Sequence, residues 1–221
     1  MPTNEPPTPH PVLSVYADAE LTPEVAASRR ATVAARRVIA GLVNSASPAA
    51  VLEPAADALE QIADQLEPHA RASRYDGTPG VQPGGDNAPI LESHPMIGPS
   101  NPIAPPLEIT RDDRHAYATG TYGHAYEGPP GRLHGGFIAS AFDQVIGAAA
   151  ALAGKVFLTG KLTIRYRKAT PLHVPLRFEA EIDREESRRI HASGRLLVDG
   201  EVTADAEGVF IVVDDKIFHE G

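Results

Sequence analysis

The chain has 221 residues, no cysteine, and 29 acidic against 20 basic residues, which gives a formal net charge of −9. An acidic chain lacks the basic surface that general nucleic-acid binding requires, so no nucleic-acid partner is expected. The absence of cysteine excludes disulfides and thiolate metal sites, while a hydrophobic content of 42% is enough for a buried core.

The N-terminal residues 1–18 are rich in proline and predict a loose tail. They show neither the basic region nor the apolar region of a secretory signal, so a cytoplasmic location is expected. The only long apolar stretch, residues 137–153, contains Asp143 and Gln144. Because it is short for a bilayer, no membrane span is predicted.

Two helices are predicted in the N-terminal third. Thr22 and Pro23 have the residue types of an N-cap and a first helical position, and an Ala/Arg-rich stretch continues to about residue 43. Ser47-Pro48 repeats the start signal, and Pro54 is expected to kink the first turn or to shift the start to that point. An apolar face at helical spacing follows, made of Leu52, Ala55, Ala56, Leu59, Ile62, Ala63 and Leu66.

Residues 74–102 read RYDGTPGVQPGGDNAPILESHPMIGPSNP, and their density of proline and glycine predicts no regular element. Loops of this length are typical of lids or linkers. The predicted organisation is therefore a tail and helical extension over residues 1–75, a linker or lid over 76–102, and a main domain over 103–215.

The main domain has a different pattern. Residues 115–122 have strand character, residues 135–153 predict one long helix, and strands are predicted over 156–167, 172–183, 189–198 and 202–213. Asp199-Gly200 is the sharpest hairpin signal. Short connections between consecutive strands favour antiparallel pairing, so we predict an α+β architecture with one helix against one sheet.

The predicted helix carries a single acid. One face gathers apolar residues for the core, and the opposite stripe is small except for Asp143: Gly136, Ala139, Ser140, Gly147 and Ala150. Gly136 lies two turns before Asp143, at the helix start, where backbone N–H groups are unpaired. The stripe by itself does not show that Asp143 is a working group, because it is also consistent with a solvated acid or with a helix–helix contact.

Four segments of the chain resemble the hotdog-fold acyl-CoA thioesterases, and in particular the phenylacetate-degradation type and the thioesterase superfamily members four and five. They are NPIAPPLEI (101–109), YEGPPGRLHGGFIASAFDQVIG (126–147), FLTGKLTIRYRKATPL (157–172) and VTADAEGVFIVV (202–213). The most specific feature is His-Gly-Gly, then an Asp nine residues after the His, then a Thr sixteen residues further on. This resemblance implies a hotdog fold, in which five to six antiparallel strands wrap one long helix.

The resemblance also implies roles for single residues. Asp143 would activate water or attack the thioester carbonyl, and the Gly136 amide would hold the carbonyl oxygen. In this family the acid and the amide come from different subunits, which implies a homodimer or a dimer of dimers. Thr159 would orient the water or the carboxylate, with Gly160 marking a bulge; threonine is also simply common in strands. His134 would bond near the thioester, or it would only fix the turn before the helix.

For coenzyme A, the basic residues Arg165, Arg167 and Lys168 are candidate phosphate ligands, together with Gly135; the alternative is a solvated outer face of the sheet. The histidines show no metal-ligand spacing, so no metal and no cofactor are expected. The leading hypothesis is an acyl-CoA thioesterase with an acyl-CoA substrate. The alternatives are a non-catalytic hotdog module that binds acyl-CoA or serves in assembly, and a hotdog dehydratase or hydratase.

Overall fold

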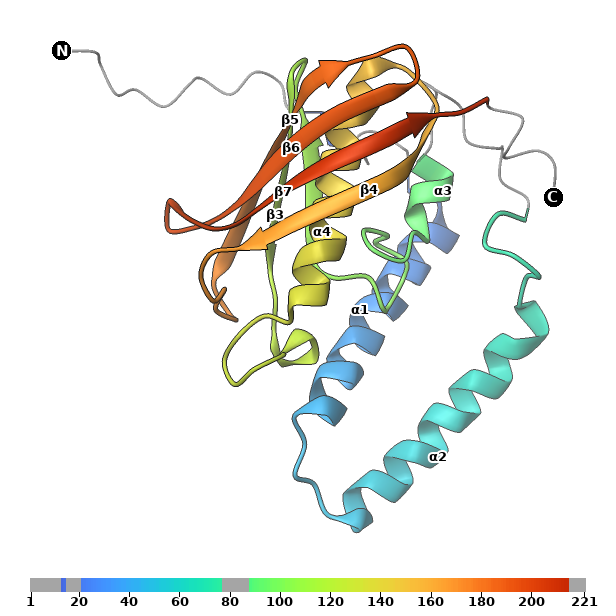
Figure 1. Ribbon diagram of the computed structural model, residues 1–221. Helices are drawn as coiled ribbons and strands as arrows, with labels where there is room; N and C mark the ends of the chain where they lie inside the picture. The colour runs from blue at the N-terminus through green and yellow to red at the C-terminus, as the bar shows by residue number, and fades with distance from the viewer. Residues whose placement is uncertain (1–12, 15–20, 77–87, 215–221) are drawn as a thin grey trace.

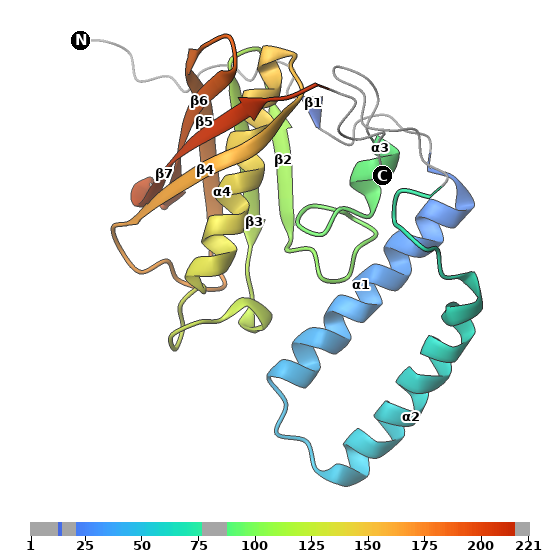
Figure 2. The same cartoon turned by 45° about the vertical axis from the view of Figure 1, so that its right-hand side comes forward.

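A computed structural model describes residues 13–14, 21–76 and 88–214. Its C-terminal part is an antiparallel sheet curled around one central helix, α4 (Gly135–Ala150), and its N-terminal part is a pair of helices beside that unit (Figures 1 and 2). This arrangement confirms the predicted α+β fold, with a long central helix and an N-terminal helical region.

The sheet contains six main strands and one short one, in the order β1-β2-β3-β5-β6-β7-β4, and every pairing is antiparallel. The strands are β1 (Leu13–Ser14), β2 (Leu107–Arg111), β3 (His115–Thr121), β4 (Phe157–Tyr166), β5 (Pro175–Glu185), β6 (Arg189–Val198) and β7 (Glu201–Val212). The predicted tail is thus partly wrong, since residues 13–14 pair with β2; the rest of residues 1–20 lies outside the described part of the chain.

Helix α4 and the short 3-10 helix η3 (Ala151–Ala153) carry the chain from β3 to β4, which lies at the far edge beside β7. Because the sheet curls around α4, the apolar face of the helix is covered, and Phe142 packs edge-to-face on Phe178 at 5.3 Å between ring centroids. The predicted core face is buried as far as Ala149, but Leu152 is only half-buried and Ala150, placed on the small stripe, is buried.

Residues Gly135–Ala153 are long and apolar enough to cross a membrane by length and composition alone, contrary to the expectation from sequence. In the structure this helix lies against the sheet, and Phe142, Val145 and Ile146 have no exposed surface. A core helix of a folded domain meets the same criterion, so the finding is weak support for a membrane span.

The N-terminal helices are α1 (Pro23–Val43) and α2 (Ala49–Leu66), which ends in the 3-10 turn η1 (Glu67–His69). Thr22 is the N-cap of α1, as predicted, and its Oγ1 accepts a hydrogen bond from the amide of Val25 at 3.3 Å. Helix α2 begins directly after Pro48 and continues through Pro54, so the expected shift of its start to Pro54 is wrong.

The segment expected to lack regular structure contains the short helix α3 (Ala88–Glu92). Partners distant in sequence bind the carbonyl groups at its end, because Arg74 donates to the carbonyl of Ile90 at 3.0 Å and the amide of Ser100 donates to that of Glu92 at 2.9 Å. Ile97, a few residues on, belongs to the same buried core as α4. Residues 77–87 lie outside the described part.

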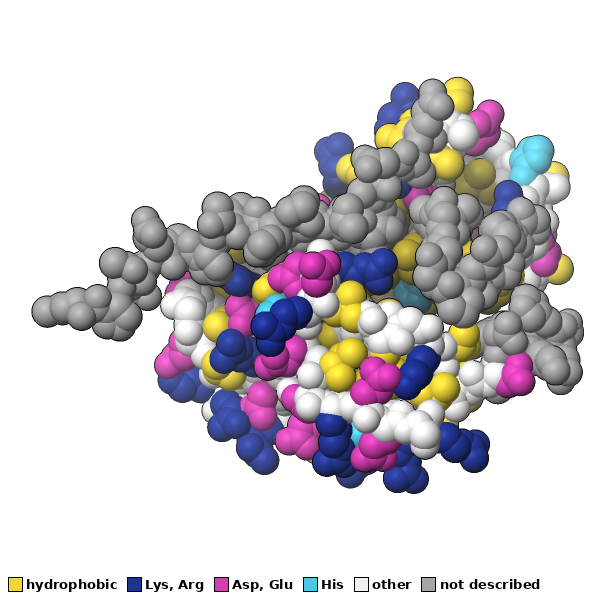
Figure 3. All heavy atoms as spheres, turned by 90° about the horizontal axis from the view of Figure 1, so that it is seen from above, with side chains coloured by type: hydrophobic (Ala, Val, Ile, Leu, Met, Phe, Trp, Pro, Cys, Tyr) yellow, Lys and Arg dark blue, Asp and Glu magenta, His cyan; other side chains and the backbone are white. Residues whose placement is uncertain are grey.

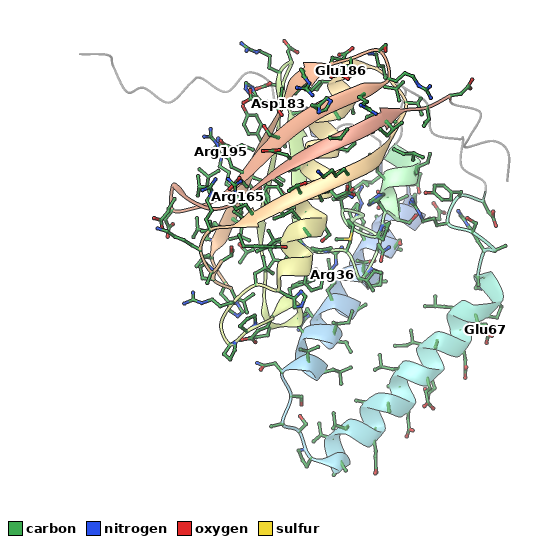
Figure 4. All side chains as sticks on the ribbon, in the orientation of Figure 1. Arg36, Glu67, Arg165, Asp183, Glu186 and Arg195 are labelled. Atoms are coloured by element: carbon green, nitrogen blue, oxygen red, sulfur yellow. The ribbon has the colours of Figure 1, made fainter. Side chains whose placement is uncertain are left out.

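The outer face of the sheet is polar, with acidic and basic side chains interspersed over the surface (Figure 3). Arg195 donates to Glu179 at 3.0 Å, and Ser193 donates to Asp183 at 2.6 Å on neighbouring strands (Figure 4). The hairpin between β6 and β7 turns at Asp199 and Gly200, with φ values of 50° and 80°, as the Asp-Gly pair predicted.

Candidate active site

The acid of α4 is held by a neighbouring strand. Thr159 of β4 donates its hydroxyl to Asp143 Oδ1 at 3.0 Å, and Gln144 Nε2 lies 3.3 Å from Asp143 Oδ2. The Asp143 side chain is half-buried. A carboxylate oxygen can accept more than one hydrogen bond, so each oxygen retains capacity to accept a proton from water. The structure therefore joins Asp143 and Thr159, sixteen residues apart, as one unit.

A bulge in β4 accompanies this contact. The register between β4 and β7 shifts between Thr159 and Lys161, so the bulge predicted at Gly160 is confirmed. A Cβ atom at Gly160 would lie 2.7 Å from Cγ1 of Ile211, which is closer than two carbon atoms approach. Any larger residue at the irregularity that follows Thr159 would force the side chain of Ile211 to shift.

At the start of α4, His134 is the N-cap, and its Nδ1 accepts a hydrogen bond from the amide of Gly136 at 3.0 Å. The Gly136 amide, predicted as an unpaired donor, is thus paired within its own chain. His134 is exposed rather than buried, yet it does fix the helix start. The carbonyl of Gly135 accepts the hydroxyl of Tyr166 at 2.8 Å.

Strand β4 runs along α4 and contacts both parts of the candidate site. Its Thr159 meets the helix at Asp143, and its Tyr166 meets the helix at Gly135. Asp143 and Gly136 remain two turns apart on one helix, roughly 10 Å along its axis at the rise of an α-helix. Within one chain, the two groups are therefore too far apart to contact the same atom of a ligand.

The three predicted phosphate ligands lie at the end of β4 and just beyond it, close to Tyr166 and so to the start of α4. In this structure all three have acidic partners. Arg167 pairs with Asp205 of β7, and Arg165 lies 3.9 Å from the same carboxylate; Lys168 pairs with Glu201. Arg165 is 69% exposed (Figure 4). Three cations face two carboxylates here, so the cluster keeps a net positive charge.

His94 is a member of the site region that sequence reasoning missed. It follows α3, its Nδ1 accepts the amide of Met96 at 3.2 Å, and its carbonyl accepts the amide of Gly98 at 2.8 Å. The pKa of His94 is lowered to about 4, first by burial and then by the charge of Arg74, while the charge of Asp143 opposes both. The imidazole of His94 is therefore neutral at pH 7, and its pKa responds to the charge of Asp143. No local signal in the Pro/Gly-rich segment marked this residue.

We expect His94 to make folding stability depend on acid pH. Its pKa is 6.5 in the ordinary case and about 4 in the fold, so between these values the unfolded chain binds a proton that the folded chain does not. Stability is therefore lost as the pH falls from 6.5 towards 4. In His94→Asn, the amide oxygen can accept the Met96 N–H as in an Asx turn, and part of this loss should disappear.

Urea unfolding of both proteins at pH 7 and pH 4.5 measures this effect. Other carboxyl groups titrate in the same range, and their contribution is common to both proteins. Equal losses of stability in the wild type and in His94→Asn would contradict the assignment to His94.

Other acidic and histidine side chains form no recognisable centre. His124 Nδ1 lies 2.9 Å from Glu127, in the turn before α4, and His115 lies between Asp112 and Glu181. Among the described residues there is no group of three or more His, Asp or Glu side chains placed to hold a metal ion. The chemistry at hand is therefore that of a carboxylate, a hydroxyl and a helix N-terminus.

Comparison with known proteins places this geometry in a family. Residues 130–204, which contain Gly135, Asp143 and Thr159, match the model of the thioesterase superfamily. The chain is 34% identical over 71 residues to the human acyl-coenzyme A thioesterase THEM5, and 34% identical over 67 residues to the Xenopus laevis acyl-coenzyme A thioesterase THEM4. These matches span 32% and 30% of this chain, but only 29% and 30% of the two curated relatives.

A solved structure of a thioesterase superfamily protein matches over a greater length. It is 35% identical, with a TM-score of 0.74, and the alignment covers 83% of this chain and 94% of that one. An alignment of this coverage includes more than the segment around the central helix. Together with the match over residues 130–204, it shows that this chain belongs to the thioesterase superfamily.

Proposed function

We propose that this protein hydrolyses acyl-CoA thioesters to a free acid and coenzyme A. The observation that carries the proposal is the carboxylate of Asp143, oriented by the Thr159 hydroxyl at 3.0 Å on a helix of small residues. The names of the two curated relatives support the same substrate class.

In the proposed reaction Asp143 accepts a proton from water while the water oxygen attacks the thioester carbonyl carbon. The C–S bond then breaks, and the coenzyme A sulfur leaves and takes up a proton. Direct attack by the carboxylate, followed by hydrolysis of the anhydride, is the alternative route through the same residue. Both routes need the carboxylate held in place, which is the role proposed for Thr159.

The oxyanion donor is proposed to be the Gly136 amide of a second copy of the chain. Two observations support this division. Asp143 and Gly136 of one chain are too far apart to contact the same carbonyl group, and Gly136 lies at a helix N-terminus, where the dipole favours negative charge. Since His134 Nδ1 accepts this amide in the structure, the imidazole must turn away when the amide binds the carbonyl oxygen.

The phosphates of coenzyme A are proposed to bind at Arg165, Arg167 and Lys168. The phosphate monoester of coenzyme A carries more charge than a carboxylate and can replace Asp205 and Glu201 as their partner. The cluster lies next to Tyr166, whose hydroxyl contacts Gly135, so a nucleotide bound there would extend from the start of α4.

Release of free coenzyme A tests the function directly. The chain contains no cysteine, so a thiol reagent detects the product without background from the protein. We expect turnover with at least one member of a panel of short, long and aromatic acyl-CoAs. Binding of these compounds without any turnover would favour the non-catalytic module, a reading consistent with the paired state of the Gly136 amide.

A change at Thr159 tests its role as a positioning residue. Thr159→Val keeps the shape of the side chain and removes the donor to Asp143, so kcat should fall by about tenfold or more with little change in KM, as for a lost bond to a charged group. Thr159→Ser should restore most of the activity, because it keeps the hydroxyl. A valine variant with the wild-type kcat would remove Thr159 from the proposed mechanism.

A further inference from the structure

Helix α2 is the most exposed regular element of the described chain. All 18 of its residues are exposed, including large apolar side chains such as Val51 (56%), Ile62 (52%) and Leu66 (64%). In proteins most of the stability of a helix comes from tertiary packing of its apolar face. The predicted apolar face of α2 is therefore present, and no described residue of its own chain covers it.

A stripe of acid runs beside this apolar face. At about 100° per residue the four carboxylates of α2 lie on one side of the helix, next to the apolar residues, and the helix contains no Lys or Arg. They are Glu53, Asp57, Glu60 and Asp64. A partner for α2 must therefore be apolar and basic; the surface of an anionic membrane would repel this stripe.

Helix α1 presents that complementary surface. One of its faces is anchored to the body of the protein, because Arg29 pairs with Glu92 at 2.7 Å and Arg36 donates to the carbonyl groups of Gly98 and Asn101 (Figure 4). About 100° further round the helix axis, Arg30 and Arg37 are exposed and form no ion pair with any described residue. Exposed apolar residues flank them, among them Val33 (56%) and Val38 (39%).

The spacing of the charges also matches. Arg30 and Arg37 are seven residues apart, as are Glu53 and Glu60, and likewise Asp57 and Asp64. Seven residues are two helical turns, roughly 10 Å. Two arginines on one helix can therefore face two carboxylates on another at the same time.

The structure does not bring these two faces together within one chain. Helix α2 stands apart from α1 along its length (Figures 1 and 2), and no described ion pair or hydrogen bond joins the two helices. Both ends of α2 are tethered. Residues 44–48 link it to α1, and Arg74, beyond its C-terminal end, binds the carbonyl of Ile90. A second copy of the chain offers the same two faces without this constraint.

We propose that the α1–α2 hairpin is a docking surface for the same hairpin of a second copy of this chain. The acidic and apolar faces of each α2 pack on Arg30, Arg37 and the apolar residues of the partner's α1. A two-fold axis satisfies both contacts at once, because each chain supplies one basic and one acidic helix. The surface is separate from the proposed catalytic residues and goes beyond the thioesterase function.

Charge exchange between two variants tests this pairing. The first variant, Arg30→Glu/Arg37→Glu, has acidic residues on both facing surfaces. The second, Glu53→Arg/Asp57→Arg/Glu60→Arg/Asp64→Arg, reverses the whole acidic stripe of α2, so that both of its facing surfaces are basic. Neither can pair with itself, whereas a mixed dimer restores opposite charges at both contacts. Hydrogen exchange of residues 49–66 reports whether α2 is covered.

We expect the amides of α2 to exchange about tenfold faster, or more, in either variant alone than in the wild type, and to regain protection when the two variants are mixed. Arg114→Glu/Arg188→Glu is the matched control, since it makes the same change of charge at two exposed turns and should leave exchange in α2 unchanged. Sedimentation should show a larger assembly in the mixture than in either variant alone, because the hairpin contact adds to any dimer formed at the catalytic site.

Two results would overturn the proposal. If the amides of α2 kept their protection in each variant alone, these charges would not be what keeps α2 covered. Protection absent from the mixture, but present in one chain that carries all six changes, would show that α2 packs on α1 of its own chain. Release of coenzyme A is measured separately, so neither result bears on the proposed function.

Discussion

Replacing Asp143 by asparagine is expected to lower kcat by about a thousandfold, within the range measured for loss of a general base. The amide has nearly the shape of the carboxylate, and its oxygen can still accept the Thr159 hydroxyl that now donates at 3.0 Å. The fold around α4 should therefore be unchanged while the group that accepts the proton of water is lost. Steady-state release of coenzyme A measures kcat, and binding of unreacted acyl-CoA should persist.

Asp183→Asn is the matched control for this variant. Asp183 is an exposed aspartate on the outer face of the sheet, where it accepts a hydrogen bond from Ser193 at 2.6 Å that asparagine can also accept (Figure 4). The activity of Asp183→Asn should equal that of the wild type. If Asp143→Asn were as active as Asp183→Asn, the carboxylate of Asp143 would have no part in the reaction.

Two inactive variants are expected to restore activity when they are mixed. Asp143→Asn removes the proposed base, and Gly136→Pro removes the proposed amide donor. If each site combines Asp143 of one chain with Gly136 of the other, a mixed dimer contains one intact and one doubly damaged site. Random pairing makes half of the dimers mixed, so about a quarter of the wild-type activity should return.

The test requires that both variants fold and associate, which circular dichroism and sedimentation establish before mixing. Asp143→Asn mixed with Asp143→Ala is the control, because no pairing of these chains contains an intact acid. Activity that stayed at the level of this control would show that the Gly136 amide does not complete the site across two chains.

Local signals predicted the elements that depend on nearby residues. The cap at Thr22, the Asp-Gly hairpin and the bulge at Gly160 each reflect a conformational preference that acts within a few residues. Helix α3 could not be predicted in this way. Its terminal carbonyl groups are bound by Arg74 and Ser100, which only the fold brings to it.

The candidate site was likewise predicted only in part. Helical periodicity isolated Asp143 on its stripe of small residues, and the family resemblance added Thr159. Neither the periodicity nor the resemblance predicted the partners of the Gly136 amide and of the three basic residues. These partners, His134, Asp205 and Glu201, are determined by side-chain geometry. His94 was missed for the same reason, since its lowered pKa arises mainly from burial, which only the folded chain produces.

The sequence by itself determined the types of most elements, the order in which they follow one another, and the single acid on the central helix. These depend on periodicity and turn chemistry, which are properties of short segments. Only the tertiary structure decided that β4 lies at the sheet edge beside β7, that Thr159 reaches Asp143, and that no described residue covers α2. Such contacts join residues far apart in the chain, and their formation depends on how the whole chain packs rather than on the preferences of any one segment.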